Sequence, residues 1–68
     1  MITEESILYI PENKSHYTVK KYIKKKAKNK TENWYRLLPV EQRQFAYEIN
    51  MNEEDLSSYI RREIIIIK

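Results

Sequence analysis

The sequence predicts a mainly α-helical domain with three to four short helices and a short β-strand at each end of the chain. Three observations favour this fold class. Apolar residues recur at helical spacing in the middle of the chain, capping residues and prolines separate these stretches, and both ends carry short isoleucine-rich runs. With 68 residues there is room for one small core, so we expect a single small domain over residues 1–68.

The first expected element is a short strand. Residues 6–10 read Ser-Ile-Leu-Tyr-Ile, a run of β-branched and aromatic side chains that stops at Pro11. A turn over residues 11–14 is expected to follow. Because glycine is absent from the chain, any position that needs a positive φ must use another residue at some energetic cost.

Residues 15–28 predict a helix. Its apolar residues fall at positions i, i+3, i+4 and i+8, which is one helical face: Val19, Tyr22, Ile23 and Ala27. Lysines occupy the other side of this helix. Because like charges repel one turn apart, the helix needs tertiary packing or a bound polyanion to be stable.

Two more helices are expected before residue 51. Thr31 caps a short helix that ends at Leu38, since the residue before Pro39 avoids the α region. Pro39 then begins a second helix that runs to about Asn50, where a left-handed residue ends it. The side chains expected to face the core are Trp34, Leu37, Leu38, Phe45, Ala46 and Ile49. For the aromatic residues Tyr22, Trp34 and Tyr59, the alternative to a place in the core is base stacking or an interface contact.

The C-terminal part predicts one last helix and a strand. Asn52 is a good N-cap, and the apolar residues Leu56, Tyr59 and Ile60 then recur at i, i+3 and i+4. The run of four isoleucines at residues 64–67 favours a strand. An exposed edge of this kind aggregates, so we expect it to pair with the N-terminal strand, in the same chain or in a second chain of a homodimer.

Positive charge is concentrated in one segment. Residues 14–30 contain eight lysines and no acidic residue, a formal charge of +8, whereas the whole chain carries +3. Such a block is either a solvated face or a surface for polyanions. The acids are concentrated elsewhere, including three in succession at residues 53–55.

Residues 42–61 read as two short helices joined by a tight turn, a helix-turn-helix. This pattern resembles the DNA-binding unit of small phage and plasmid repressors of the Cro and CI type. Ala46 stands at the small residue where the two helices approach closely, and Asn50 stands at the turn where the family usually has glycine. The apolar core positions of the unit are matched by Phe45, Ile49, Met51, Leu56 and Tyr59.

The resemblance covers about 20 of the 68 residues and implies a DNA-binding transcriptional regulator of phage or plasmid type that binds duplex DNA. The residues facing the groove would be Ser57, Ser58, Arg61 and Arg62. The residues holding phosphates would be Lys20, Lys21, Lys24, Lys25 and Lys28.

An alternative function is a small phage-type protein that binds and inhibits or modulates a host protein. The three acids at residues 53–55 favour it, because they would oppose DNA phosphates at the start of a recognition helix. In that case the helical pair is only part of the core.

No catalytic site, metal site, cofactor or small-molecule substrate is expected. Cysteine and glycine are absent, which excludes thiolate metal sites and glycine-rich phosphate loops, and His16 is the only histidine. The longest apolar run, at residues 64–67, is far shorter than the roughly 20 residues of a membrane span. We therefore expect a cytoplasmic protein that does not use the membrane as a partner.

Overall fold

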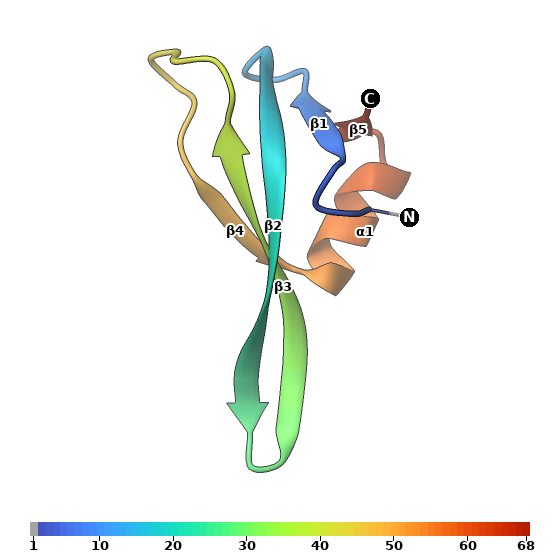
Figure 1. Cartoon of the computed structure of the whole chain (residues 1–68). Coiled ribbons are helices and arrows are strands. Elements are labelled where there is room, and N and C mark those ends of the chain that lie inside the picture. The colour runs from blue at the N-terminus through green and yellow to red at the C-terminus, as the bar shows by residue number, and fades with distance from the viewer. Residues whose placement is uncertain (1) are drawn as a thin grey trace.

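The computed structural model describes residues 2–68, which form a five-stranded antiparallel sheet with one helix. The elements, in chain order, are β1 (Ile7–Ile10), β2 (Ser15–Ala27), β3 (Lys30–Pro39), β4 (Ile49–Asn52), α1 (Glu53–Arg61) and β5 (Ile66–Ile67). The strand order is β4-β3-β2-β1-β5, so the two long strands β2 and β3 lie at the centre (Figure 1). The predicted mainly α-helical fold is therefore wrong.

The helix predicted over residues 15–28 is the strand β2. Burial alternates at its start, where Ser15, Tyr17 and Val19 are buried and Thr18 is exposed. This period of two belongs to a strand, and β-branched and aromatic residues prefer a pleated, half-buried surface. The helical spacing that begins at Val19 is a coincidence, because all residues from Ile23 onward in β2 are exposed and face no core.

The helix predicted to end at Leu38 is the strand β3. Tyr35 and Leu37 point to the core, while Trp34 and Leu38 lie on the opposite face and are half-buried. On a helix Leu37 and Leu38 would share one side, but on a strand neighbouring side chains point to opposite faces. The partner strand β2 decides the outcome, because it supplies the cross-strand hydrogen bonds.

The helix predicted from Pro39 to Asn50 is also absent, and so is the helix-turn-helix. Residues 40–48 form a connecting loop, in which Phe45 is 72% exposed and Ala46 is half-buried away from any helix contact. Asn50 lies in β4, where it pairs with Arg36 and ends no helix. Only the second of the two helices expected at residues 42–61 is formed.

The predicted pairing of the two terminal strands is confirmed, although the C-terminal strand contains only Ile66 and Ile67 of the run at residues 64–67. β1 lies within the predicted N-terminal strand, and it pairs with β5 of the same chain at Leu8↔Ile67 and Tyr9↔Ile66. Asn52 is the N-cap of α1, because its side-chain oxygen accepts a hydrogen bond from the backbone N–H of Asp55 at 2.7 Å.

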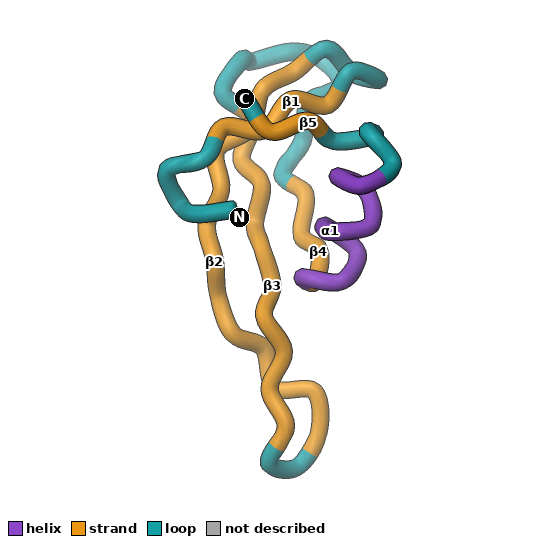
Figure 2. Tube along the Cα trace, turned by 90° about the vertical axis from the view of Figure 1, so that its right-hand side faces the viewer, coloured by secondary structure: helices purple, strands orange, loops and turns teal. Residues whose placement is uncertain are grey.

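The core lies between one face of the sheet and α1, which packs beside β3 and β4 (Figure 2). Leu56 is the buried residue of the helix, and it is 1% exposed. The core is made by Leu8, Ile10, Tyr17, Val19, Tyr35, Leu37, Met51, Leu56 and Ile65. Because all of these strand residues point toward α1, the other face of the sheet is left without a covering layer.

Within residues 2–68, three residues adopt a positive φ: Lys14, Asn29 and Glu63. Glu63 follows α1 with φ 60°. Its backbone N–H donates to the carbonyl of Ile60 at 3.0 Å, and that of Ile64 donates to the carbonyl of Tyr59 at 2.9 Å. These two bonds form a Schellman motif, whose left-handed position is usually occupied by glycine.

We predict that Glu63→Gly stabilises the protein by about 1 kcal/mol, because glycine has no Cβ to strain the left-handed conformation. The measurement is the free energy of unfolding in urea. Glu63→Gln is the matched control, since it removes the same charge from the helix end but keeps the Cβ. If the glutamine variant is as stable as the glycine variant, the backbone conformation is not the source of the gain.

Candidate nucleic-acid interface

The β2–β3 hairpin extends well beyond the rest of the sheet. β1 pairs with β2 only from Ser15 to Thr18, and β4 pairs with β3 only from Trp34 to Leu37. Beyond these positions the hairpin is a free two-stranded ribbon, and Figure 1 shows it projecting away from α1 and the other strands. From Lys24 to Thr31 every residue of the ribbon is exposed. Nearer the core, the backbone N–H of Lys21 donates to the carboxylate of Glu4 at 3.2 Å.

A two-residue turn and a bulge shape the tip of this hairpin. Ala27 pairs with Lys30, and between them Asn29 has φ 64°, which asparagine tolerates better than most residues. The register shifts between Lys25 and Ala27, so Lys26 is the additional residue of a bulge. A bulge increases the local twist of a strand pair, which turns the lysines of the tip in several directions.

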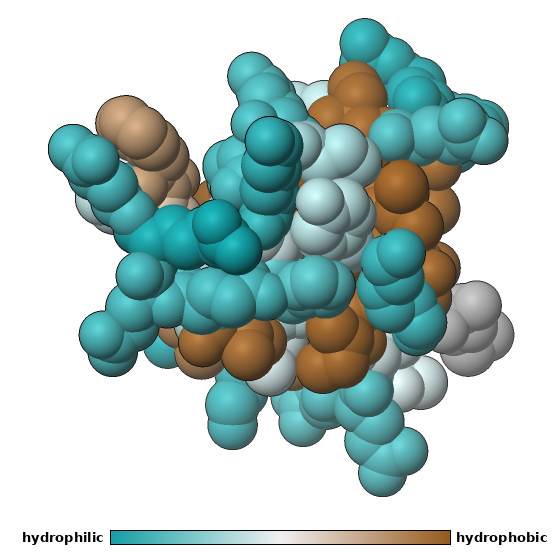
Figure 3. All heavy atoms as spheres, turned by 90° about the horizontal axis from the view of Figure 1, so that it is seen from above, coloured by the Kyte–Doolittle hydropathy of each residue, from teal (hydrophilic) through white to brown (hydrophobic). Residues whose placement is uncertain are grey.

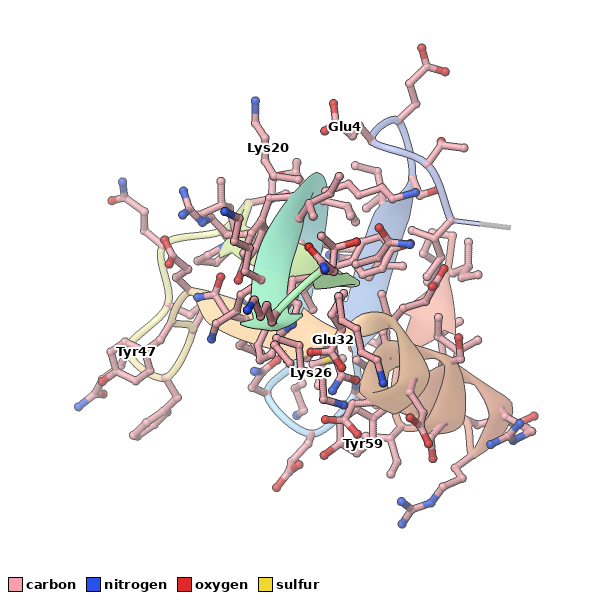
Figure 4. The ribbon with its side chains drawn as sticks, turned by 90° about the horizontal axis from the view of Figure 1, so that it is seen from below. Glu4, Lys20, Lys26, Glu32, Tyr47 and Tyr59 are labelled. Carbon is pink, nitrogen blue, oxygen red and sulfur yellow. The ribbon has the colours of Figure 1, made fainter. Side chains whose placement is uncertain are left out.

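The hairpin carries a dense positive charge. Residues 20–30 contain seven lysines and no acidic residue, and all seven are exposed: Lys20, Lys21, Lys24, Lys25, Lys26, Lys28 and Lys30. Within residues 2–68, Lys26 is the one lysine among these that forms an ion pair, at 3.5 Å from Glu32 on the opposite strand (Figure 4). That pair is exposed and stabilises the fold little. The remaining charges are available to a polyanion.

The side of β2 and β3 opposite α1 combines aromatic and cationic side chains. We call this surface the open face, and it consists of Lys20, Tyr22, Lys24, Glu32, Trp34 and Arg36. Tyr22 pairs directly with Trp34 across the strands, and their ring centroids lie 6.4 Å apart. The Lys24 ammonium lies 4.3 Å from the Trp34 ring centroid, and the Arg36 guanidinium lies 5.8 Å from that of Tyr22.

Hydrogen bonds hold the two rings in place. The indole Nε1–H of Trp34 donates to Glu32 at 2.8 Å, and the hydroxyl of Tyr22 donates to Asn50 at 3.1 Å. Both rings are half-buried, so each keeps part of its surface in contact with solvent. Lys20 points away from the side on which α1 lies (Figure 4). The open face therefore presents two hydrogen-bonded rings among exposed cations.

Acidic side chains lie on the opposite side of the hairpin base. The carboxylate of Glu53, at the start of α1, accepts hydrogen bonds from Asn33 at 3.3 Å and from the hydroxyl of Tyr35 at 3.4 Å. Burial and then the negative charge of Glu53 raise the pKa of Tyr35, so this phenol stays protonated. Glu54 and Asp55 are exposed beside it. Lys21 and Arg61 line the groove beside Glu53, so this side carries both signs of charge, whereas the open face carries one carboxylate among three cations.

The structure divides the residues predicted to bind DNA between two places. Lys20, Lys21, Lys24, Lys25 and Lys28 lie on the hairpin, on strands instead of a helix. On α1 and its C-cap, Ser57, Arg61 and Arg62 are exposed and Ser58 is half-buried. One groove of about 520 Å³ brings together Lys21, Ser57 and Arg61. The other six residues do not line it.

Sequence reasoning missed part of this surface. It left out Lys26, Lys30 and Arg36, and it assigned Tyr22 and Trp34 to the core. The alternation of lysine with aromatic residues at Lys20, Tyr22 and Lys24 is the signal that could have identified the open face. That signal is meaningful only for a strand, in which every second residue shares a face.

The loop of residues 40–48 closes the other end of the molecule. The carboxylate of Glu41 accepts hydrogen bonds from the backbone N–H of His16, at 2.7 Å, and from its ring. Glu48 lies 3.7 Å from Arg36 and anchors the other end of the loop. Between these anchors Phe45 is 72% and Tyr47 69% exposed. Figure 3 shows hydrophobic atoms between hydrophilic side chains at this end, and Tyr47 points outward in Figure 4.

Within residues 2–68, no three His, Cys, Asp or Glu side chains are grouped so that they could hold a metal ion. In the same part of the chain, no helix has the length and apolar character needed to cross a membrane.

We predict that Glu41 makes stability depend on pH. The backbone N–H of His16, and then its ring, lower the pKa of the Glu41 carboxyl below its ordinary value of 4.5. The stabilisation is therefore present above pH 4.5 and is lost as the pH falls through the lower pKa of the folded state.

Urea unfolding at several pH values would measure this effect. Acidification below about pH 4.5 should destabilise the wild type more than Glu41→Gln. His16→Ala should keep the larger part of the effect, because the backbone donor remains. Parallel pH profiles for the wild type and Glu41→Gln would contradict the assignment.

Comparison with protein-family models, with curated proteins and with solved structures found no match to this chain. The function proposed for the protein therefore depends on its sequence and on the geometry of the β2–β3 hairpin.

Proposed function

We propose that the protein binds nucleic acid through its β2–β3 hairpin. The observation that carries this proposal is the group of seven exposed lysines on the hairpin, without an acidic residue among them, of which the five from Lys24 onward lie on the ribbon that projects beyond the core. Lysines that neutralise phosphates release condensed counterions, and this release supplies most of the affinity of sequence-independent binding. A regulator that binds duplex DNA, the function expected from the sequence, belongs to this class.

In this proposal the β2–β3 hairpin contacts the phosphates, a role that the sequence assigned to a helix over residues 15–28. A two-stranded ribbon is narrow enough to enter the major groove of DNA, as an α-helix is. The lysine block is unfavourable for the fold itself, because it places like charges close together along β2 and sets Lys20 opposite Arg36 on β3. A bound polyanion reduces this repulsion, so the proposed binding explains why the charge pattern is tolerated.

We predict that removing three lysines from the tip weakens binding strongly. The variant Lys25→Ala/Lys28→Ala/Lys30→Ala should bind an oligonucleotide at least tenfold more weakly at about 0.1 M salt. The plot of log K against log salt should become shallower by about 2–3, since each lost phosphate contact removes about 0.7–0.9 from the slope. Titrations at several salt concentrations, read by fluorescence anisotropy of a labelled oligonucleotide, would measure both quantities.

A control variant removes the same charge from elsewhere. Lys14→Ala/Arg61→Ala/Arg62→Ala also lowers the formal net charge from +3 to 0, and all three of these residues are exposed away from the hairpin tip. It should keep most of the affinity and the salt slope. If the two triple variants weaken binding equally, the hairpin is not the binding element and only net charge matters.

Protein binding is the second candidate function, and the exposed Phe45 and Tyr47 favour it. Aromatic side chains that protrude from a loop are common anchors at protein interfaces. In this case a host protein is the partner and the loop of residues 40–48 is the contact. Nucleic acid is then irrelevant to the interaction.

We predict that Phe45→Ala/Tyr47→Ala leaves nucleic-acid binding and thermal stability unchanged, because both rings are exposed. A protein partner captured by the wild type after nuclease treatment should be lost by this variant but kept by Gln42→Ala/Gln44→Ala in the same loop. A partner that is retained by the aromatic variant would exclude the loop as its contact.

A further inference from the structure

We propose that the open face binds unpaired bases by stacking them on Tyr22 and Trp34, so that the nucleic acid bound by this protein is single-stranded. This inference rests on the proposed function and names the substrate class of the same surface. It differs from the duplex DNA expected from the sequence. The observations that carry it are the position of the two rings, their hydrogen bonds and the charges around them.

The two rings lie where a nucleic-acid strand on the hairpin would pass. They occupy the last cross-strand pair before the hairpin leaves the other strands, and the lysines of the ribbon begin beside them. α1 covers only the opposite side, where Glu53 contacts Asn33 and Tyr35. The open face is therefore the side of the hairpin that a polyanion following the lysines can reach without meeting α1.

The Tyr22–Trp34 pair is better suited to stacking unpaired bases than to contacting a duplex. The grooves of a duplex present base edges, whereas an unpaired base presents a flat π-face to an aromatic ring. Tyr22 and Trp34 come from adjacent strands, so two bases can use them in succession. Every base has a π-face, so we expect little sequence preference from this contact.

The rings are ordered before a base arrives. Glu32 and Asn50 fix the indole and the phenol, so little side-chain freedom is lost on binding. The Lys24 ammonium over the indole shows that this ring face accommodates a partner. A base that replaces the ammonium leaves Lys24 free to contact a phosphate.

The acids close to the rings are already neutralised by cations. Glu32 accepts from Trp34 and pairs with Lys26, and Glu48 pairs with Arg36. Lys20 and Lys24 have no such partner among the residues that the structure describes. The charge left on the open face is therefore positive, as contacts to the phosphates of a single strand require.

The experiment uses Trp34, the single tryptophan, as its own probe. The full chain is titrated with an oligothymidylate of about 12 nucleotides, and separately with a duplex of the same length, at low salt. We expect the single strand to quench the tryptophan fluorescence and to bind more tightly than the duplex. Tyr22→Leu, which keeps this reporter, should weaken single-strand binding by about 5- to 150-fold, the fold-change of one lost stacking contact.

Matched variants separate stacking from loss of the fold. Tyr47→Leu removes an exposed tyrosine at the other end of the molecule and should leave both affinities unchanged. In anisotropy measurements, Trp34→Phe should bind the single strand more tightly than Trp34→Leu, since only phenylalanine restores a ring. These outcomes, with unfolding curves that show folded variants, support the inference.

Other outcomes overturn it. If the duplex binds as tightly as the single strand, with unchanged Trp34 fluorescence, while the three-lysine variant still loses affinity, stacking is excluded and the proposed function remains. If neither nucleic acid binds at low salt, both the inference and the proposed function are wrong.

Discussion

The antiparallel pairing of β2 and β3 is the interaction on which the rest of the structure depends. β1 and β4 add to the two sides of this pair, and α1 covers one of its faces. The register places Val19 opposite Leu37, so both point to the core. A shift of one residue would turn these side chains outward, because neighbouring strand residues point to opposite faces. The core and the open face are therefore fixed by the same register.

Structure and proposed function use different parts of the same two strands. The first part of β2 and the last part of β3 provide buried residues, and the tip of the hairpin provides none. An isolated two-stranded ribbon is only marginally stable, and like charges weaken it further. The tip thus contributes little to folding. This is expected of a binding surface, because side chains that contact a ligand cannot also pack in the core.

The errors of the helical prediction have a common physical cause. Apolar residues spaced three and four apart favour a helix only if the helical face that they form packs against a core. Ile23, which belongs to the predicted face, is 68% exposed and meets no core. Likewise Trp34 and Leu38 share the side opposite the core residue Leu37. The lysine block could be found from composition, but the Tyr22–Trp34 pair could not, since it requires the register of two strands.

The sequence by itself determined the start of α1, the pairing of the two terminal strands and the position of the lysine block. The side chain of Asn52 caps α1 within three residues, and the isoleucine run had to find a partner strand to avoid an exposed edge. Only the tertiary structure decided that residues 15–39 form strands. Their register pairs positions as far apart as Tyr17 and Pro39, and the strand that completes the backbone hydrogen bonds decides between helix and strand there.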